Sequence, residues 1–165
     1  MNTFPAVTGV TADPALRGYR NLTEVSLDFT VAAALSVASH EVFTVTGTVE
    51  YTVLYVCITD LTSGGSATIQ FGREGATDSV SASQAFSGID AGDIIIPGGS
   101  NATVSASATH RANTTAGRGS DIISGLDLGY EIGTAALTGG TMKAYCWWTP
   151  ITADGSVVAG ALGAL

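Results

Sequence analysis

The sequence predicts an all-β domain, a β-sandwich or jelly roll, with an extended N-terminal arm and a docked C-terminal tail. The first observation is the stretch from Thr48 to Thr59, which alternates along one face for its whole length. The second is that turn signals recur about every ten residues, as in sandwiches and jelly rolls. The third is that no long amphipathic helix pattern interrupts these signals.

The domain organisation follows from composition and periodicity. The 165 residues suit one domain with extensions, and they can bury a core without metals or disulfides. Residues 1–22 show no sustained periodicity, and Pro5 and Pro14 hold the backbone extended, so we expect an arm. Residues 23–152 form the predicted β domain. The tail, residues 153–165, ends in the apolar run SVVAGALGAL, which we expect to be docked because free apolar segments are unfavourable in water.

The first strands are marked by alternation. Residues 23–31 alternate apolar and polar side chains, which predicts a half-buried strand. Residues 41–46 form a second strand, and Gly47 marks a bulge or bend before the long strand at 48–59. One face of that long strand is polar at its start and apolar towards its end. We therefore expect its second half to be covered on both faces, at Leu54, Val56 and Ile58.

A hairpin follows the long strand. The turn SGGS at 63–66 separates it from an alternating strand at 67–72. Residues 72–79 are predicted to form a polar loop. Residues 83–88 fit either a short helix or a strand, and the pattern leaves that choice open.

The second half of the chain carries shorter signals. A buried strand at 94–96 is stopped by a turn, and residues 102–109 alternate small apolar and hydroxyl side chains. Residues 111–121 are the most loop-like segment, and 126–132 is a further strand. The glycine pair at 139–140 is predicted to form a turn.

The last strand, residues 141–149 (TMKAYCWWT), contains two adjacent tryptophans. Neighbouring residues on a strand point to opposite faces, so Trp147 and Trp148 cannot both enter one core. We expect one of them to fill the core and the other to need a second layer or a partner chain.

The composition indicates a surface that other subunits cover. Only 12% of the residues are charged, whereas 45% are hydrophobic, so much of the exterior must be threonine, serine and glycine. An ordinary threonine- and serine-rich sandwich surface is the alternative reading. The net charge of −8 and the scattered basic residues argue against nucleic-acid binding. No signal peptide is recognised at the N-terminus, and no apolar run approaches the roughly 18 residues that span a bilayer.

No pattern indicates catalysis or metal binding. His40 and His110 each stand alone and read as surface or turn histidines. Asp90 and Asp93 lack the spacing of a calcium loop and read as turn residues. No serine elbow, nucleotide loop or paired carboxylates are selected, so we predict no enzyme, no cofactor and no metal site. The two cysteines are expected to be buried free thiols, Cys57 and Cys146.

Two segments resemble a family of tailed-bacteriophage virion proteins. They are VFTVTGTVEYTVLYVCITDLTSGGSATIQFG, within residues 41–72, and MKAYCWWTPITADGSVVAG, within residues 141–160. The family pattern is a strand pair with a Gly-Gly turn and a closing Tyr-Cys-x-Trp-x-Pro segment followed by Ala-Asp-Gly. The resemblance covers about a third of the chain, and residues 73–140 match nothing recognised. It implies a small β-domain on the virus particle, most like a capsid decoration or cement protein.

The predicted function is therefore mechanical. Such proteins often sit as trimers where shell subunits meet, so the expected partners are the major capsid protein and further copies of this chain, in a homotrimer. The expected location is the capsid surface of the virion, after synthesis in the host cytoplasm. Nucleic acid and membrane are not expected partners. The residues predicted to make contacts are Phe4, Pro5, Val7, Trp147, Trp148, Val157, Val158, Leu162 and Leu165.

Two other functions fit the same composition. The first is a receptor-binding or adhesive tip module that recognises a cell-surface glycan through exposed loops such as 111–121. Those loops lack an aromatic side chain for stacking on sugars, which counts against this function. The second is a tail-associated structural subunit, in the tail tube or connector.

Overall fold

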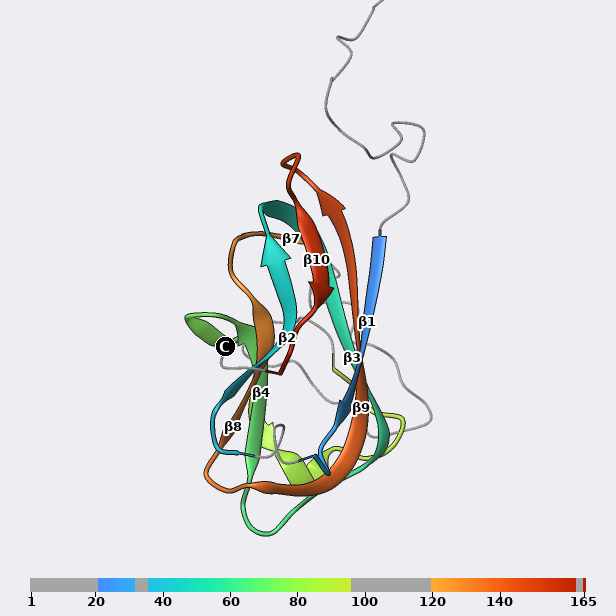
Figure 1. Cartoon of the computed structure of the whole chain (residues 1–165). Coiled ribbons are helices and arrows are strands. Elements are labelled where there is room, and N and C mark those ends of the chain that lie inside the picture. Colours follow the sequence, from blue (N-terminus) through green and yellow to red (C-terminus); the bar gives the residue numbers. More distant parts are fainter. Residues whose placement is uncertain (1–20, 32–35, 96–119, 163–164) are drawn as a thin grey trace, which may run out of the picture.

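The computed structural model describes residues 21–31, 36–95, 120–162 and 165. Within these residues the chain forms two antiparallel five-stranded sheets that face each other (Figure 1). The prediction of an all-β sandwich is confirmed. The predicted arm up to residue 20, the strand at 102–109 and residues 111–119 of the predicted loop lie outside the described residues.

Sheet A contains the two longest strands of the described chain. Its order is β1-β9-β3-β6, and β7 also pairs with β3. The strands are β1 (Asn21–Asp28), β3 (Thr48–Ser63), β6 (Ile94–Ile95), β7 (Asp121–Ser124) and β9 (Leu137–Pro150).

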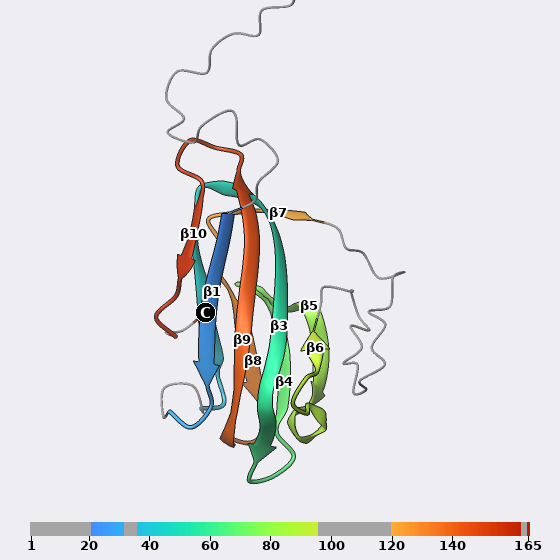
Figure 2. The same ribbon diagram turned by 90° about the vertical axis from the view of Figure 1, so that its right-hand side faces the viewer.

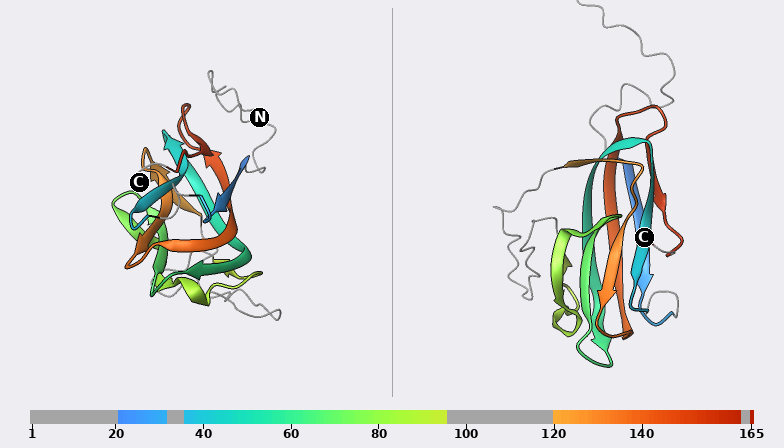
Figure 3. Two further views of the ribbon diagram at one scale, coloured as in Figure 1. Left: turned by 60° about the horizontal axis from the view of Figure 1, so that its bottom comes forward. Right: turned by 90° about the vertical axis from the view of Figure 1, so that its left-hand side faces the viewer.

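Sheet B has the order β10-β2-β8-β4-β5, and Figure 3 shows it from its outer side. Its strands are β2 (Ser39–Thr46), β4 (Thr68–Arg73), β5 (Ala76–Ala85), β8 (Leu128–Gly133) and β10 (Ser156–Ala159). The predicted C-terminal tail supplies β10, which pairs with β2 from Ser156↔Thr46 to Ala159↔Phe43. The expectation of a docked tail is therefore confirmed.

Several predicted boundaries need correction. The polar loop expected at 72–79 is a tight β4–β5 hairpin, since Arg73 pairs with Ala76 across Gly75, whose φ is +72°. Residues 83–88 divide between the end of β5 and a 3-10 turn, η3 (Phe86–Gly88). Gly47 is the bend between β2 and β3, with a φ of +60°.

The glycine pair at 139–140 does not form the predicted turn. Both residues lie inside β9, where Gly139 pairs with Thr62. Gly140 has a φ of +111°, and a Cβ atom there would lie 2.6 Å from Leu61 Cδ2. The glycine therefore permits a close approach of β9 to β3 next to the register shifts of this pair.

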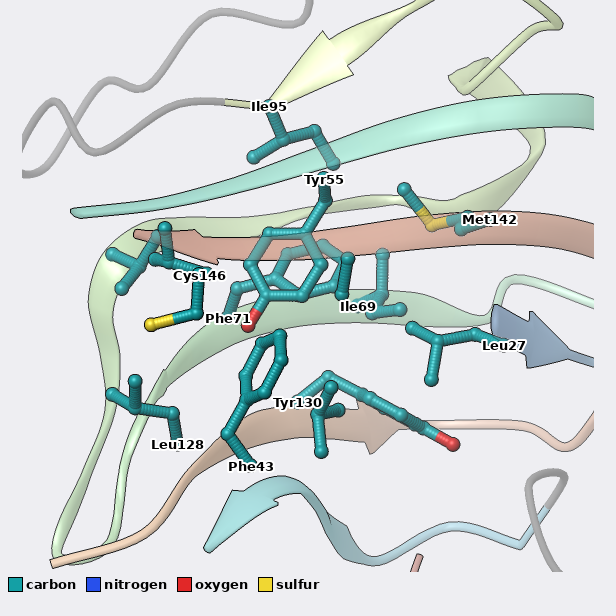
Figure 4. Packing of buried hydrophobic residues seen from close by; sticks show 14 of the residues in the cluster. Leu27, Phe43, Tyr55, Ile69, Phe71, Ile95, Leu128, Tyr130, Met142 and Cys146 are labelled. Atoms are coloured by element: carbon teal, nitrogen blue, oxygen red, sulfur yellow. The ribbon is translucent and has the colours of Figure 1, made fainter. Parts of the chain in front are cut away.

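The core fills the space between the sheets with aromatic and branched side chains (Figure 4). The ring of Phe29 meets those of Phe86 and Tyr130 edge-on, each with centroids 5.5 Å apart. Tyr55 projects from β3 into this layer, with its ring centroid 4.2 Å from that of Phe71. Among the described residues, the buried hydroxyl of Tyr55 has no hydrogen-bond partner. The core thus contains a polar atom whose desolvation no described residue offsets.

Candidate functional site

The two faces of β9 separate the adjacent tryptophans. Met142, Ala144 and Cys146 point into the core, and Trp148 packs against the same cluster. Trp147 lies on the opposite face beside Tyr145, with ring centroids 5.9 Å apart and planes inclined by 23°. The prediction that the two tryptophans face opposite ways is confirmed, and the structure identifies Trp147 as the outward one.

The sheet A outer face is the surface around Trp147. Its cross-strand rows are fixed by register: Leu22, Trp147 and Thr52 form one row. Glu24, Tyr145 and Leu54 form the next, and Ser26, Lys143, Val56 and Ile94 form the third. Its apolar members on these strands and on β7 are Leu22, Leu54, Val56, Ile58, Ile94, Ile122, Tyr145 and Trp147.

Exposure of this face corrects the sequence prediction for β3. Figure 2 views the face, and no described strand crosses in front of β1, β9 and β3. Ile58 keeps 47% of its surface exposed, whereas Leu54 and Val56 are partly buried, so the described residues cover the second half of β3 only in part on this face. Leu22 on β1 and Ile122 on β7 are 52% and 60% exposed. The apolar positions that predicted an inner layer are thus part of a partly exposed surface whose apolar members come from all five strands of the sheet.

The described residues place few charges on the sheet A outer face, and most of these charges are acidic. Lys143 donates a hydrogen bond to Glu24 Oε1, and this bond raises the pKa of the Lys143 ammonium. Asp28, at the end of β1, accepts hydrogen bonds from the Thr30 hydroxyl and backbone, which lower the pKa of its carboxyl. With Glu50 on β3, three carboxylates share the outward positions with one ammonium. The apolar centre therefore has an acidic rim.

Trp148 belongs to the seam between the sheets. Its Nε1 donates to Thr23 Oγ1 at 3.1 Å, and Thr23 Oγ1 donates to the Val157 carbonyl at 2.8 Å. These two bonds connect β9 and β1 of sheet A to β10 of sheet B. Trp148 therefore serves the fold directly, which distinguishes it from Trp147.

The tail residues predicted to make contacts lie in different environments. Val157 is buried in the core, and Leu162 packs against it. Val158 is 53% exposed on the outer side of sheet B, opposite Thr44. The Leu165 backbone N–H donates to the Ser39 carbonyl at 3.3 Å. The arm residues Phe4, Pro5 and Val7 lie outside the described residues, so none of the predicted contacts to other chains is tested by this structure.

The histidine and aspartates have structural partners. His40 is buried and stacks on Tyr130, with Nε2 3.0 Å from the Ser36 carbonyl, so the prediction of a surface or turn position was wrong for this histidine. Asp93 Oδ2 accepts from the Asp90 backbone N–H at 3.0 Å, as a turn residue does. In the described part of the chain, no three histidine, cysteine or acidic residues form a group that could hold a metal ion.

Both cysteines are buried free thiols, as predicted. Burial raises the pKa of the Cys146 thiol to about 12 and that of Cys57 to about 11. Cys57 Sγ donates to the Thr59 carbonyl at 3.2 Å. The raised pKa values keep both side chains protonated and unreactive at neutral pH.

Comparisons with known proteins leave the family open. No family model, no curated protein and no solved structure matches the chain. Separately, none of the described segments is a helix long and apolar enough to cross a bilayer. The resemblance to phage virion proteins therefore stays a prediction. The sheet A outer face is the feature of the described chain that most needs a functional explanation.

Proposed function

We propose that this chain is a structural subunit that decorates and cements an assembled protein shell, the capsid of a tailed bacteriophage. The observation that carries the proposal is the sheet A outer face, an open apolar surface centred on Trp147 and Tyr145. Its composition is that of the buried part of an interface: aromatic at the centre, apolar around it and acidic at the rim. The proposal assigns the chain no catalytic step.

The free energy that each copy could gain by covering this face suits a lattice of many weak contacts. Full burial of a leucine or isoleucine side chain is worth roughly 1.5–3 kcal/mol, and Leu22, Ile58 and Ile122 are already about half buried. Covering these three contributes on the order of 3 kcal/mol per copy before association costs. Since a subunit that binds only the assembled shell stabilises it by mass action, many such copies would resist internal pressure together.

The test uses particles that lack this chain. Purified protein is added back, and both binding and the temperature of genome release are measured. We expect the wild-type chain to bind and to raise the release temperature, and Trp147→Ser to lose most of both effects. Val37→Ser is the matched control, because Val37 is 55% exposed but precedes β2, away from the sheet A outer face. Absence of shell binding, or an equal loss in the control, would contradict the proposal.

A second candidate function is glycan recognition by a receptor-binding module. The stacked pair of Tyr145 and Trp147 supplies the aromatic surface that the loops lack, and Lys143 and Glu24 supply polar groups beside it. The same preparation separates the two functions. Purified protein that binds host cells and blocks adsorption, with no effect on the release temperature, would favour glycan recognition.

A further inference from the structure

We propose that residues 1–20 of one copy lie across the sheet A outer face of a second copy. This inference rests on the proposed assembly function and names the segment that covers the same surface. A segment that covers this surface needs apolar side chains at its centre, to match Leu22 and Trp147. It needs basic side chains at its edge, to match the carboxylates around them. The first twenty residues of this chain have that chemistry.

The charge distribution singles out the arm. Residues 1–20 carry Arg17 and Arg20 against Asp13, whereas the rest of the chain carries four of the six basic residues and thirteen of the fourteen acidic ones. A segment with a net positive charge therefore precedes a strongly acidic domain. On the sheet A outer face, Lys143 already forms an ion pair with Glu24, and Asp28 and Glu50 add further negative charge. Arginines are the side chains that such a rim attracts.

The apolar pattern of the arm suits contact through side chains. Phe4, Val7, Val10, Leu16 and Tyr19 are distributed along its length. The two prolines in the arm lack a backbone N–H and favour extended neighbours, so the arm is poorly suited to adding a full strand to a sheet edge. An extended segment laid over an open face requires no such pairing.

The point of attachment favours a neighbouring copy. The arm joins β1 at Asn21, which pairs with Trp148, and the next residue, Leu22, already lies on the sheet A outer face. To cover its own face, the chain would have to reverse direction immediately before β1. Twenty extended residues reach up to about 66 Å, whereas the eight residues of β1 span about 26 Å. The arm is thus long enough to cross the face of an adjacent molecule.

The experiment uses the full chain without shells. An Ala6→Cys substitution places a reactive thiol in the arm, and the raised pKa values of Cys57 and Cys146 restrict labelling with a benzophenone maleimide to position 6. Chains that carry the benzophenone are mixed with 15N-labelled chains, irradiated and digested, and the cross-linked peptides are identified by mass spectrometry. We expect most adducts to join position 6 to outward positions of β1, β3 or β9. Adducts between a peptide with natural nitrogen and a 15N-labelled peptide show that two copies of the chain are joined.

Charge reversal provides the second readout. Arg17→Glu in the labelled chain should reduce the yield of these adducts about fivefold, whereas Arg118→Glu, outside the arm, should leave it unchanged. Adducts within one chain only, adducts to sheet B, or no adducts would overturn the inference. Adducts that appear only with shells present and join the shell protein would also overturn it. In each of these cases shell binding by the wild-type chain would still support the proposed function, so the two failures are distinguishable.

Discussion

The buried hydroxyl of Tyr55 makes the most direct prediction about stability. This group has no hydrogen-bond partner in the part of the chain that the structure describes, and the side chain is completely buried between the sheets. Burial, together with the nearby Cys146 and Tyr51, raises the pKa of the phenol, so the group stays neutral. Tyr55→Phe removes the oxygen and leaves the ring and its contact with Phe71 in place. We expect the variant to be more stable than the wild-type chain.

The expected gain is the difference between two effects. Leaving a buried hydroxyl without a partner costs about 1–3 kcal/mol. Removing its oxygen opens a void of roughly 10 Å3, which costs about 0.2 kcal/mol at roughly 24 cal/mol per Å3. The net stabilisation by Tyr55→Phe is therefore about 1–3 kcal/mol, and each 1 kcal/mol raises the Tm of a chain of this size by about 2–4 °C.

Urea unfolding followed by tryptophan fluorescence measures this difference, with an unchanged m-value as the check that only stability has altered. Thr23→Val is the matched control, because it also deletes one hydroxyl but one that has two partners, the Trp148 indole and the Val157 carbonyl. We expect that variant to lose about 2 kcal/mol. A Tyr55→Phe variant that is less stable than wild type would refute the reasoning, since it would mean that the hydroxyl is satisfied in solution.

Three other perturbations have clear expected outcomes. Burial raises the pKa values of Tyr51 and Cys146 to about 12, so above pH 9–10 these groups lose their protons in the unfolded chain but keep them in the folded one. The free energy of unfolding, measured as the pH is raised, should therefore fall by about 1.4 kcal/mol per pH unit for each group until about pH 12. Gly140→Ala should cost more than 2 kcal/mol in urea unfolding, because its Cβ meets β3 at a φ of +111°, whereas Gly75→Ala, with open space and a φ of +72°, should cost about 1 kcal/mol. Trp148→Ser should lower the free energy of unfolding by about 3 kcal/mol, because it removes the packing of the ring against the core and its hydrogen bond to Thr23. An unfolding midpoint like that of the wild-type chain would contradict the position of Trp148 between the sheets.

Much of the fold could be predicted because alternation is a local property of the sequence. The inward residues of β3, from Val49 to Cys57, are all buried, and so are Met142, Ala144 and Cys146 of β9. Strand pairing could not be predicted in this way, because register depends on contacts between distant segments. The pair Gly139 and Gly140 shows the consequence: their composition indicates a turn, but the close approach of Leu61 requires glycine inside the strand.

His40 was misplaced for a related reason. A single histidine carries no periodic signal, and its position at the start of β2 suggested an exposed strand entry. Its burial depends on Tyr130, which stacks on the ring from β8, and on the Ser36 carbonyl, which lies 3.0 Å from Nε2. Tyr130 is brought to His40 by the tertiary structure, and Ser36, four residues before His40, contributes a backbone carbonyl that a residue of any type could supply, so neither contact leaves a mark in the sequence around the histidine.

The candidate site emerged where the sequence prediction for β3 failed. Leu54, Val56 and Ile58 are apolar at alternate positions, which is the pattern of a strand face buried under a second layer. Hydrophobic periodicity reports only that a face avoids water, and it cannot tell whether the cover comes from the same chain or from another molecule. None of the described strands covers this face, and an intermolecular cover is the explanation that we propose for the pattern, with the neighbouring Trp147 and Tyr145 at its centre.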